Sequence, residues 1–100
     1  PNSKPSWFGF LLTCREGVDK NKVVQYIEDH GVQTRMLFAG NIVKQPCFDE
    51  MRASGKGYRV VGDLAVTDRI MKDTFWLGVY PGMTDEKIDY MAKVIKEALQ

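Results

Sequence analysis

The sequence is poor in the residues that most often carry catalysis or bind metals. Its 100 residues include one histidine, His30, and two cysteines, Cys14 and Cys47, which do not form a CxxC motif. A single histidine without a paired nucleophile cannot form a Ser-His-Asp triad, and these three side chains do not make a convincing tetrahedral metal site. H-E-x-x-H and the phosphate-loop motif are also missing. We therefore expect no catalytic residue and no metal ligand in this chain.

Long apolar runs and a strong excess of charge of one sign are missing as well. The longest apolar stretches fall far short of the roughly 20 residues that span a bilayer, and no signal peptide is recognisable. The net charge is +1, so no strong positive field points to nucleic acid. We expect a cytoplasmic protein with neither membrane nor nucleic acid as a partner. The cysteines are interpreted as buried free thiols, with a single disulfide as the open alternative.

What is present suffices for one small globular domain. The chain is 44% apolar, 11% aromatic and 27% charged, which is typical of a folded protein with a single core. Residues 1–5 contain two prolines and no initiator Met, and we interpret them as the remnant of a linker. Residues 6–100 then form the domain. Either a leader has been removed, or the chain is one piece of a larger protein.

Hydrophobic periodicity predicts an α/β (α+β) fold with the order β-α-β-(α)-α-β-α. Strands are predicted over residues 6–14, 32–38 and 74–80, and helices over residues 20–30, 47–53, 64–72 and 85–99. Asp19, Asp63 and Thr84 are the predicted helix N-caps. We expect a small three-stranded, largely antiparallel sheet packed with helices, in which the third strand lies between the other two.

The predicted core residues recur at helical spacing. They are Val23, Val24 and Ile27 in the first helix, Phe48 and Met51 in the second, Leu64, Thr67, Ile70 and Met71 in the third, and Ile88, Met91, Ala92, Ile95 and Leu99 in the last. Cys47 is expected to be buried beside Phe48. The position of His30 in the last turn of its helix suits the helix dipole better than it suits catalysis.

Polar side chains of several kinds gather where the second predicted strand ends. The stretch GVQTRMLFAGNIVKQPCF, residues 31–48, places Arg35 on the strand and Asn41, Lys44 and Gln45 in the loop that follows. Functional groups are often placed on a loop that a rigid element holds. The simpler interpretation, a charged strand face followed by a solvated loop, stays open.

Three sequence blocks resemble the C-terminal small domain of the fold type I sugar aminotransferase family, whose cofactor is pyridoxal phosphate. They are SWFGFLLTC, GVQTRMLFAGNIVKQPCF and TDRIMKDTFWLGVYPGMTDEKIDYM, and together they cover about residues 6–99. TRMLFAGNIVKQP and FWLGVYPGMTDE resemble the nucleotide-sugar 3-dehydrase branch, of which CDP-4-keto-6-deoxyglucose 3-dehydrase is the best-known example. Ordinary sugar aminotransferases usually have HYxPLHxQP and PLHPGLT at these places.

This resemblance implies the activity of a parent enzyme, and we expect the fragment alone to be inactive. Enzymes of this branch use pyridoxamine phosphate and an iron-sulfur cluster to remove the C3 hydroxyl of a nucleotide-linked 4-keto sugar, in lipopolysaccharide or deoxysugar biosynthesis. A histidine replaces the usual Schiff-base lysine. The implied partners are a missing N-terminal large domain that holds the cofactors, a second subunit of a homodimer, a flavin iron-sulfur reductase and the nucleotide-sugar substrate.

The resemblance also implies four residues that face substrate or cofactor: Phe8, Arg35, Phe38 and Asn41. Phe8 would be an apolar wall near the cofactor, with core packing as the rival role. Arg35 would bind a substrate phosphate or hydroxyl through its fork of donors, with a surface ion pair as the alternative. Phe38 and Asn41 would shape the pocket edge. Weaker candidates are Lys44, Gln45 and Arg69.

Two other origins stay open. The chain could be the small domain of a sugar aminotransferase of the same family, which a lysine at the Schiff-base position upstream would indicate. It could also be a free-standing α/β interaction module. If the parent is a 3-dehydrase or a sugar aminotransferase, we expect the aromatic residues Trp7, Phe8, Phe10 and Trp76 to lie on the side that faces its large domain.

Overall fold

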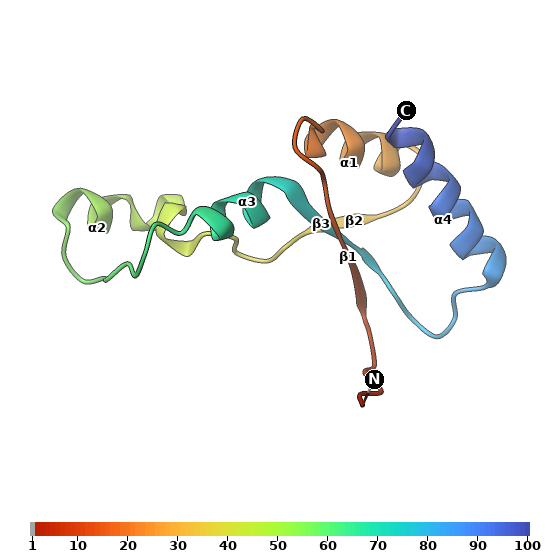
Figure 1. Cartoon of the computed structure of the whole chain (residues 1–100), viewed down its shortest axis with the longest axis horizontal. Helices are drawn as coiled ribbons and strands as arrows, with labels where there is room; N and C mark the ends of the chain where they lie inside the picture. Colours follow the sequence, from red (N-terminus) through yellow and green to blue (C-terminus); the bar gives the residue numbers. More distant parts are fainter. Residues whose placement is uncertain (1) are drawn as a thin grey trace.

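The strands form one antiparallel sheet in the order β1-β3-β2 (Figure 1). The computed structural model describes residues 2–100, so Pro1, the first residue of the predicted linker, lies outside the described residues. The elements are β1 (Gly9–Thr13), α1 (Lys20–Asp29), β2 (Thr34–Met36), the short 3-10 helices η1 (Ile42–Lys44) and η2 (Pro46–Phe48), α2 (Asp49–Ser54), α3 (Ala65–Asp73), β3 (Thr74–Gly78) and α4 (Asp85–Ala98). The predicted fold class and the central place of the third strand are confirmed, although all three strands are shorter than predicted.

Helix starts follow local capping chemistry. Asp19 and Thr84 each accept a backbone hydrogen bond at the starts of α1 and α4, as predicted. The third predicted cap is displaced by one residue. The Asp63 carboxylate accepts from the amide of Ala65 at 3.0 Å, but the N-cap of α3 is Leu64, whose φ of 55° lies in the left-handed region. The chain therefore enters α3 through a sharp turn that the sequence pattern does not announce.

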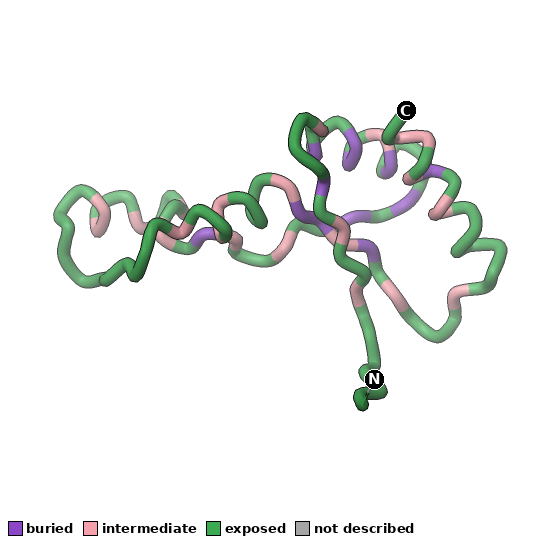
Figure 2. Tube along the Cα trace, viewed as in Figure 1, coloured by how far each residue is buried: buried purple, intermediate pink, exposed green. Residues whose placement is uncertain are grey.

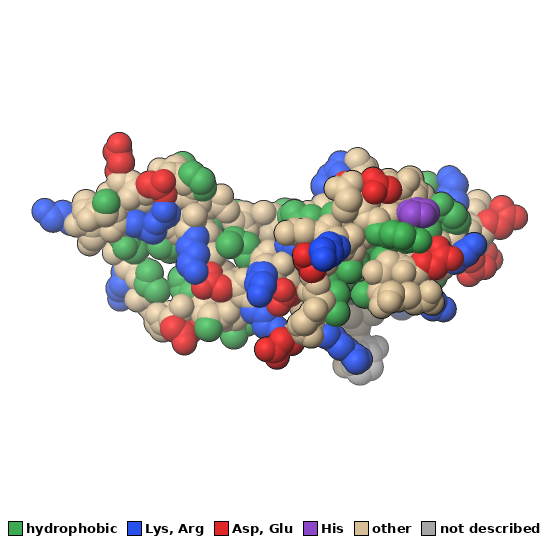
Figure 3. Space-filling view, turned by 90° about the horizontal axis from the view of Figure 1, so that it is seen from above, with side chains coloured by type: hydrophobic (Ala, Val, Ile, Leu, Met, Phe, Trp, Pro, Cys, Tyr) green, Lys and Arg blue, Asp and Glu red, His purple; other side chains and the backbone are tan. Residues whose placement is uncertain are grey.

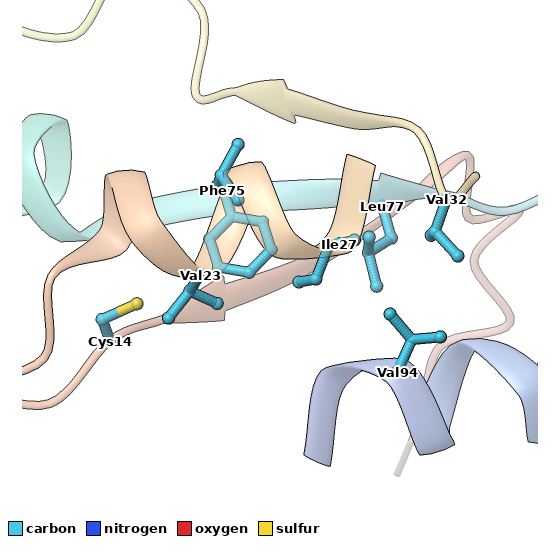
Figure 4. Close-up of a cluster of buried hydrophobic side chains, with 8 residues drawn as sticks. Cys14, Val23, Ile27, Val32, Phe75, Leu77 and Val94 are labelled. Atoms are coloured by element: carbon cyan, nitrogen blue, oxygen red, sulfur yellow. The ribbon is translucent and has the colours of Figure 1, made fainter. Parts of the chain in front are cut away.

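One face of the sheet packs against α1 and α4, and the core lies in this layer. Phe75 and Leu77 of β3 point toward Ile27 of α1 and Val94 of α4 (Figure 4). Within residues 2–100, the buried hydrophobic residues are Cys14, Val23, Val24, Ile27, Val32, Phe75, Leu77 and Val94. Full burial of a large apolar side chain contributes about 1.5–3 kcal/mol, so this cluster supplies most of the hydrophobic stabilisation.

The apolar stripe of α4 is rotated relative to the prediction. Met91 and Ile95 pack against the core as expected, but the buried residue of this helix is Val94, whereas Ile88 and Leu99 are exposed. The prediction of Ile88 and Leu99 as core residues is therefore wrong. The physical reason is that α4 packs against α1 as well as against the sheet, and the two neighbours together set the inward face.

The inward face predicted for α3 is wrong at Ile70 and Met71, which are exposed. The reason is that α3 lies outside the layer of α1 and α4 that covers the core (Figure 1).

Residues 39–64 leave the sheet as an arm that projects to one side (Figures 1 and 2). Asn41 is the only buried residue of the arm. The molecule measures 52 × 36 × 23 Å, and its radius of gyration is 17.0 Å, against about 13 Å for a compact domain of 100 residues. Its accessible surface is 8107 Å², against about 5,800 Å² for a closed monomer of this mass. The chain thus exposes about 2,300 Å² more than a closed domain would.

The two cysteines lie in different environments and are both free thiols. Cys14 is buried in the core, where burial and then the nearby Asp73 carboxylate raise the pKa of its thiol. Cys47 is exposed on η2, so the prediction that it is buried beside Phe48 is wrong; a one-turn helix on the arm has nothing packed over it at that position. The disulfide between Cys14 and Cys47 that the sequence left open is not formed.

Candidate functional site on the open face of the sheet

An aromatic cluster occupies the sheet face opposite Phe75 and Leu77. The strand register pairs Trp76 of β3 with Leu11 of β1 and with Arg35 of β2, so these three side chains share a face. Leu11 is 56% exposed, which shows that this face lacks a cover within residues 2–100. Side chains on it are available to a ligand or to another part of a larger protein.

Trp76 organises this cluster. Its indole N–H donates to the Met36 carbonyl at 3.1 Å. The ring of Phe8 meets it edge-on at 5.4 Å between centroids, and the ring of Phe38 lies at 6.3 Å with an interplanar angle of 41°. Gly9 lets the backbone of β1 lie against the Trp76 ring, because a Cβ at this residue would lie 2.9 Å from the ring. The result is a continuous aromatic surface across the middle of the sheet.

The backbone at Phe38 supports a functional interpretation. Its φ of 42° is rare for a bulky residue, and its side chain is 75% exposed. Such strain is found preferentially at functional sites. Phe8 is 65% exposed, so the rival role of core packing does not describe it. The structure therefore brings these two predicted residues together at Trp76, while their contact with a ligand stays a prediction.

The Arg35 guanidinium is held against its own strand by neutral groups. Its Nη1 donates to the Thr34 carbonyl at 2.8 Å. A guanidinium only donates, so the Gln33 amide must present its oxygen, which then accepts from Nη1 at 3.0 Å and from Nη2 at 2.8 Å. Arg35 has no carboxylate partner within residues 2–100, so the surface ion pair considered as its alternative is not formed. Its positive charge stays available.

Arg35 and Trp76 also line a groove of about 700 Å³ between β2, the end of β3 and the first half of α4. The groove exists because β2 pairs only with residues 75–77 of β3, which leaves the edge of β3 open from Gly78 onward. Its volume lies within the usual range of small-molecule sites, about 300–1,000 Å³. The other lining residues used below are Gln33, Gly78, Tyr80, Glu86 and Lys87.

Asn41 lies apart from this cluster, at the root of the arm. It is 2% exposed; its Oδ1 accepts from the Val43 amide at 3.2 Å, and its Nδ2 donates to Asp68 at 2.8 Å. Lys44 donates to the other Asp68 oxygen at 2.6 Å. The hydrogen bonds from Lys44 and then from Asn41 lower the pKa of Asp68. Both ends of the Asn41 amide are thus engaged in the fold, and its role at a pocket edge stays a prediction.

The weaker candidates are not gathered around Trp76 either. Lys44 is engaged with Asp68, the Gln45 amide donates to the Ala39 carbonyl, and Arg69 is exposed on α3. The contacts of Lys44 and Gln45 thus stabilise the arm and its junction with α3.

Sequence reasoning missed Gln33, Gly78 and Tyr80 as site residues. The signal was available in the two-residue spacing of strands, because Gln33 precedes Arg35 by two positions, and Gly78 and Tyr80 continue the spacing that starts at Trp76. That spacing does not reveal the groove, whose second wall comes from α4.

Metal ligands do not converge anywhere in the described part of the chain. Residues 2–100 contain no group of three His, Cys, Asp or Glu side chains that could hold a metal ion. Cys14 lies in the core and Cys47 on the arm, so the two thiols do not meet as ligands of one iron-sulfur cluster would. Nor is any helix in residues 2–100 both long enough and apolar enough to cross a membrane.

Comparison with known proteins agrees with the resemblance seen in the three sequence blocks. The chain is 46% identical over 97 residues to the lipopolysaccharide biosynthesis protein RfbH of Salmonella typhimurium, which covers 95% of this chain and 21% of that protein. It is 41% identical over 99 residues to the dTDP-4-dehydro-2,6-dideoxy-D-glucose 3-dehydratase of Saccharopolyspora spinosa, covering 97% of this chain and 20% of that protein. The chain thus spans about a fifth of the length of these relatives. Because residues 1–96 match the DegT/DnrJ/EryC1/StrS aminotransferase family, the chain belongs to that family.

Proposed function

We propose that residues 6–100 are the C-terminal small domain of a nucleotide-sugar 3-dehydrase, which removes the C3 hydroxyl of a nucleotide-linked 4-keto sugar such as a CDP-4-keto-6-deoxyhexose. The observation that carries this proposal is the 41% identity, over nearly the whole chain, to a protein named as a 3-dehydratase of a dTDP-linked 4-keto sugar. The similarity to a lipopolysaccharide biosynthesis protein supports a role in making deoxysugars for the cell surface.

The open sheet face supports the inference that this domain needs the rest of a parent protein. The excess exposed surface of about 2,300 Å², to which the projecting arm also contributes, is larger than the roughly 800 Å² that each partner of a stable protein interface buries. Trp7 and Phe8, which directly precede β1, and Phe10 within it are all more than half exposed. A large domain placed against this strand and against Trp76 would cover them and complete the pocket.

The residues of the open face fit one wall of a pocket for a planar phosphorylated cofactor. They offer aromatic surfaces and one uncompensated cation, Arg35. Pyridoxamine phosphate, when bound in the parent enzyme, would supply the amine that condenses with the sugar C4 ketone and makes the C3 hydroxyl a leaving group. Phe8, Phe38 and Trp76 would exclude water from that wall, and Arg35 would bind an anionic or hydroxyl group of the substrate.

The finer parts of the proposal concern the parent enzyme. Its iron-sulfur cluster would be held by the large domain and reduced by a flavin iron-sulfur reductase, and the enzyme would act as a cytoplasmic homodimer. The support for these parts is the resemblance of TRMLFAGNIVKQP and FWLGVYPGMTDE to the dehydrase branch.

The test is product analysis with the full-length parent protein. The protein, loaded with pyridoxamine phosphate and given a reductant, is incubated with CDP-4-keto-6-deoxyglucose or with dTDP-4-keto-2,6-dideoxyglucose. Mass spectrometry should show a product that has lost the C3 oxygen. In a parallel reaction with glutamate as amino donor and no reductant, we expect no amino sugar.

The second candidate is a nucleotide-sugar aminotransferase, which the name of the matched family favours. An amino sugar formed in the glutamate reaction, together with a lysine at the Schiff-base position of the parent, would select this candidate and reject the dehydrase. A gene in which these 100 residues stood alone would instead favour the free-standing interaction module.

A further inference from the structure

The groove beside Arg35 has the charge and the lining of a site for a phosphorylated ligand. Its charged residues are Arg35, Glu86 and Lys87, so its walls carry one more cation than anion. The remaining lining is apolar or aromatic apart from Gln33, a composition typical of small-molecule sites. An anionic ligand with a planar ring would match both properties.

Gln33 gives the Arg35 guanidinium a fixed direction without cancelling its charge. The amide oxygen receives two guanidinium hydrogen bonds, and the Thr34 carbonyl receives a third. A carboxylate in the same place would hold the guanidinium equally well but would neutralise it. A preoriented and uncompensated guanidinium loses little freedom when it binds a phosphate.

On the α4 wall of the groove, a second cation lies beside an aromatic ring. The Lys87 ammonium lies 3.3 Å from the Tyr80 hydroxyl and 6.0 Å from the centroid of its ring. Both residues are exposed, so neither is committed to the core. An aromatic ring that can stack on a base, next to an ammonium that can bind a phosphate, suits a nucleotide.

We propose that this groove is the subsite for the nucleoside diphosphate part of the substrate. Arg35 and Lys87 bind the phosphate oxygens, Tyr80 packs against the base, and Gln33 is the positioning residue of Arg35. The inference rests on the proposed function, because it requires a nucleotide-linked substrate. Since Arg35 and Trp76 belong to both the groove and the open face, the sugar end of the substrate then lies toward Trp76.

Gly78 offers a way to fill the groove without straining the fold. A Cβ at this residue would meet no atom within 4 Å, and its φ lies outside the left-handed region. In the full-length parent enzyme, Gly78→Leu should raise the KM for the nucleotide sugar and the Ki of CDP or dTDP at least tenfold. The kcat should stay within about twofold, and the Tm should not fall. Ala53→Leu, which adds bulk at an exposed residue of α2, is the matched control and should change none of these values.

Gln33 is tested by a pair of substitutions with opposite electrostatic effects. Gln33→Glu keeps the contact with Arg35 but adds a negative charge, whereas Gln33→Ala removes the contact and adds none. We expect Gln33→Glu to raise the Ki of inorganic pyrophosphate about tenfold and Gln33→Ala to raise it less. Equal effects of the two substitutions would indicate a purely structural role for Gln33 and would overturn that part of the proposal.

The outcomes separate this inference from the proposed function. A folded Gly78→Leu enzyme with unchanged KM and Ki overturns the subsite. A lowered Tm with unchanged KM also overturns it, because it would mean that a segment of the parent protein fills the groove. If CDP or dTDP binds the wild-type parent, and Gly78→Leu abolishes this binding while no sugar is dehydrated, the subsite stands and the proposed function fails.

Discussion

The sheet lobe, made of the three strands with α1 and α4, is held together differently from the arm, residues 39–64. All the buried hydrophobic residues lie in the sheet lobe (Figure 2). The arm is held by polar contacts: Arg52 donates to the carbonyls of Val43 and Gln45, and Asn41 binds Asp68 of α3. Segments with few buried apolar contacts open locally at lower free energy than the core does. The lobe should therefore unfold as a unit, while the arm opens by itself.

Charge does not distinguish the two regions. In Figure 3, Lys and Arg side chains alternate with Asp and Glu side chains along the visible face of the molecule, from the arm to α4. The difference between lobe and arm is thus one of apolar burial, and substitutions that alter burial or single polar contacts are the appropriate tests.

The largest expected effect comes from the core. Phe75→Ala removes a side chain that is 2% exposed and should lower the free energy of unfolding by about 3–5 kcal/mol. Val61→Ala on the arm, where the side chain is exposed, should change it by less than about 0.5 kcal/mol. Urea denaturation followed by circular dichroism measures both. A similar loss for the two variants would show that the arm is part of the same core.

The next effect concerns the joint between the arm and α3. Gly40 has a φ of 61°, and a Cβ there would lie 2.4 Å from Met71 Cγ. Gly40→Ala combines left-handed strain with overpacking and should cost about 2–4 kcal/mol. Gly55→Ala is the matched control, because its φ is 65° and its Cβ would meet nothing within 4 Å. It should cost only about 1–2 kcal/mol. Equal losses in the urea titrations would mean that Met71 moves aside freely.

A smaller effect is expected from Lys20, the buried charge that links α1 to α3. Its Nζ donates to the Met71 carbonyl at 2.8 Å, in the last turn of α3, where the helix leaves carbonyls unpaired. Lys20→Met should lower the free energy of unfolding by about 1 kcal/mol. The loss of the hydrogen bond is partly offset because the variant no longer buries a charge. Amide hydrogen exchange should quicken in residues 65–73 and in the arm but not in β3. Lys22→Met, at an exposed residue of the same helix, should leave the exchange unchanged, and faster exchange throughout the lobe would contradict the local role of Lys20.

The fold could be predicted from the sequence wherever a pattern is local. Strand alternation, the caps Asp19 and Thr84, and the order of elements fixed the class and the central third strand. The phase of α4 could not be predicted, because Val94 is selected by contact with α1, and no local pattern contains that contact. The exposure of Cys47 was missed for a related reason, since an apolar residue in the arm is not covered by any neighbouring element.

The candidate site was predictable to a similar extent. Alternation and register place Arg35 on the Trp76 face, and the sequence contains that pattern. Phe8 and Phe38 have the opposite parity in their strands, and they reach Trp76 only because they lie just outside β1 and β2, Phe8 at a bend and Phe38 at a positive φ. Asn41 follows Phe38 by three residues in the same sequence block, but its amide donates to Asp68 and does not face Trp76. The groove was not predictable, because it depends on how early β2 stops pairing and on where α4 lies.

The smallest expected effect concerns the root of the arm, where Asn41 and Lys44 bind Asp68 of α3. Hydrogen bonds from Lys44 and Asn41 hold the pKa of Asp68 below its usual value. A carboxylate whose pKa is lowered in the folded state stabilises that state above its unfolded pKa, about 3.9, and loses this contribution as the pH falls through the folded value. The difference in stability between wild type and Asp68→Asn should therefore be constant from about pH 5 to pH 7 and shrink below about pH 4. It should be small, because the Lys44–Asp68 pair is partly exposed and screened by solvent. Urea titrations at several pH values measure it, and in a Lys44→Met background most of the pH dependence should vanish, since Lys44 is the main cause of the shift. A difference that persisted unchanged to low pH would show that the root is held by the shape of its side chains and not by the charge of Asp68.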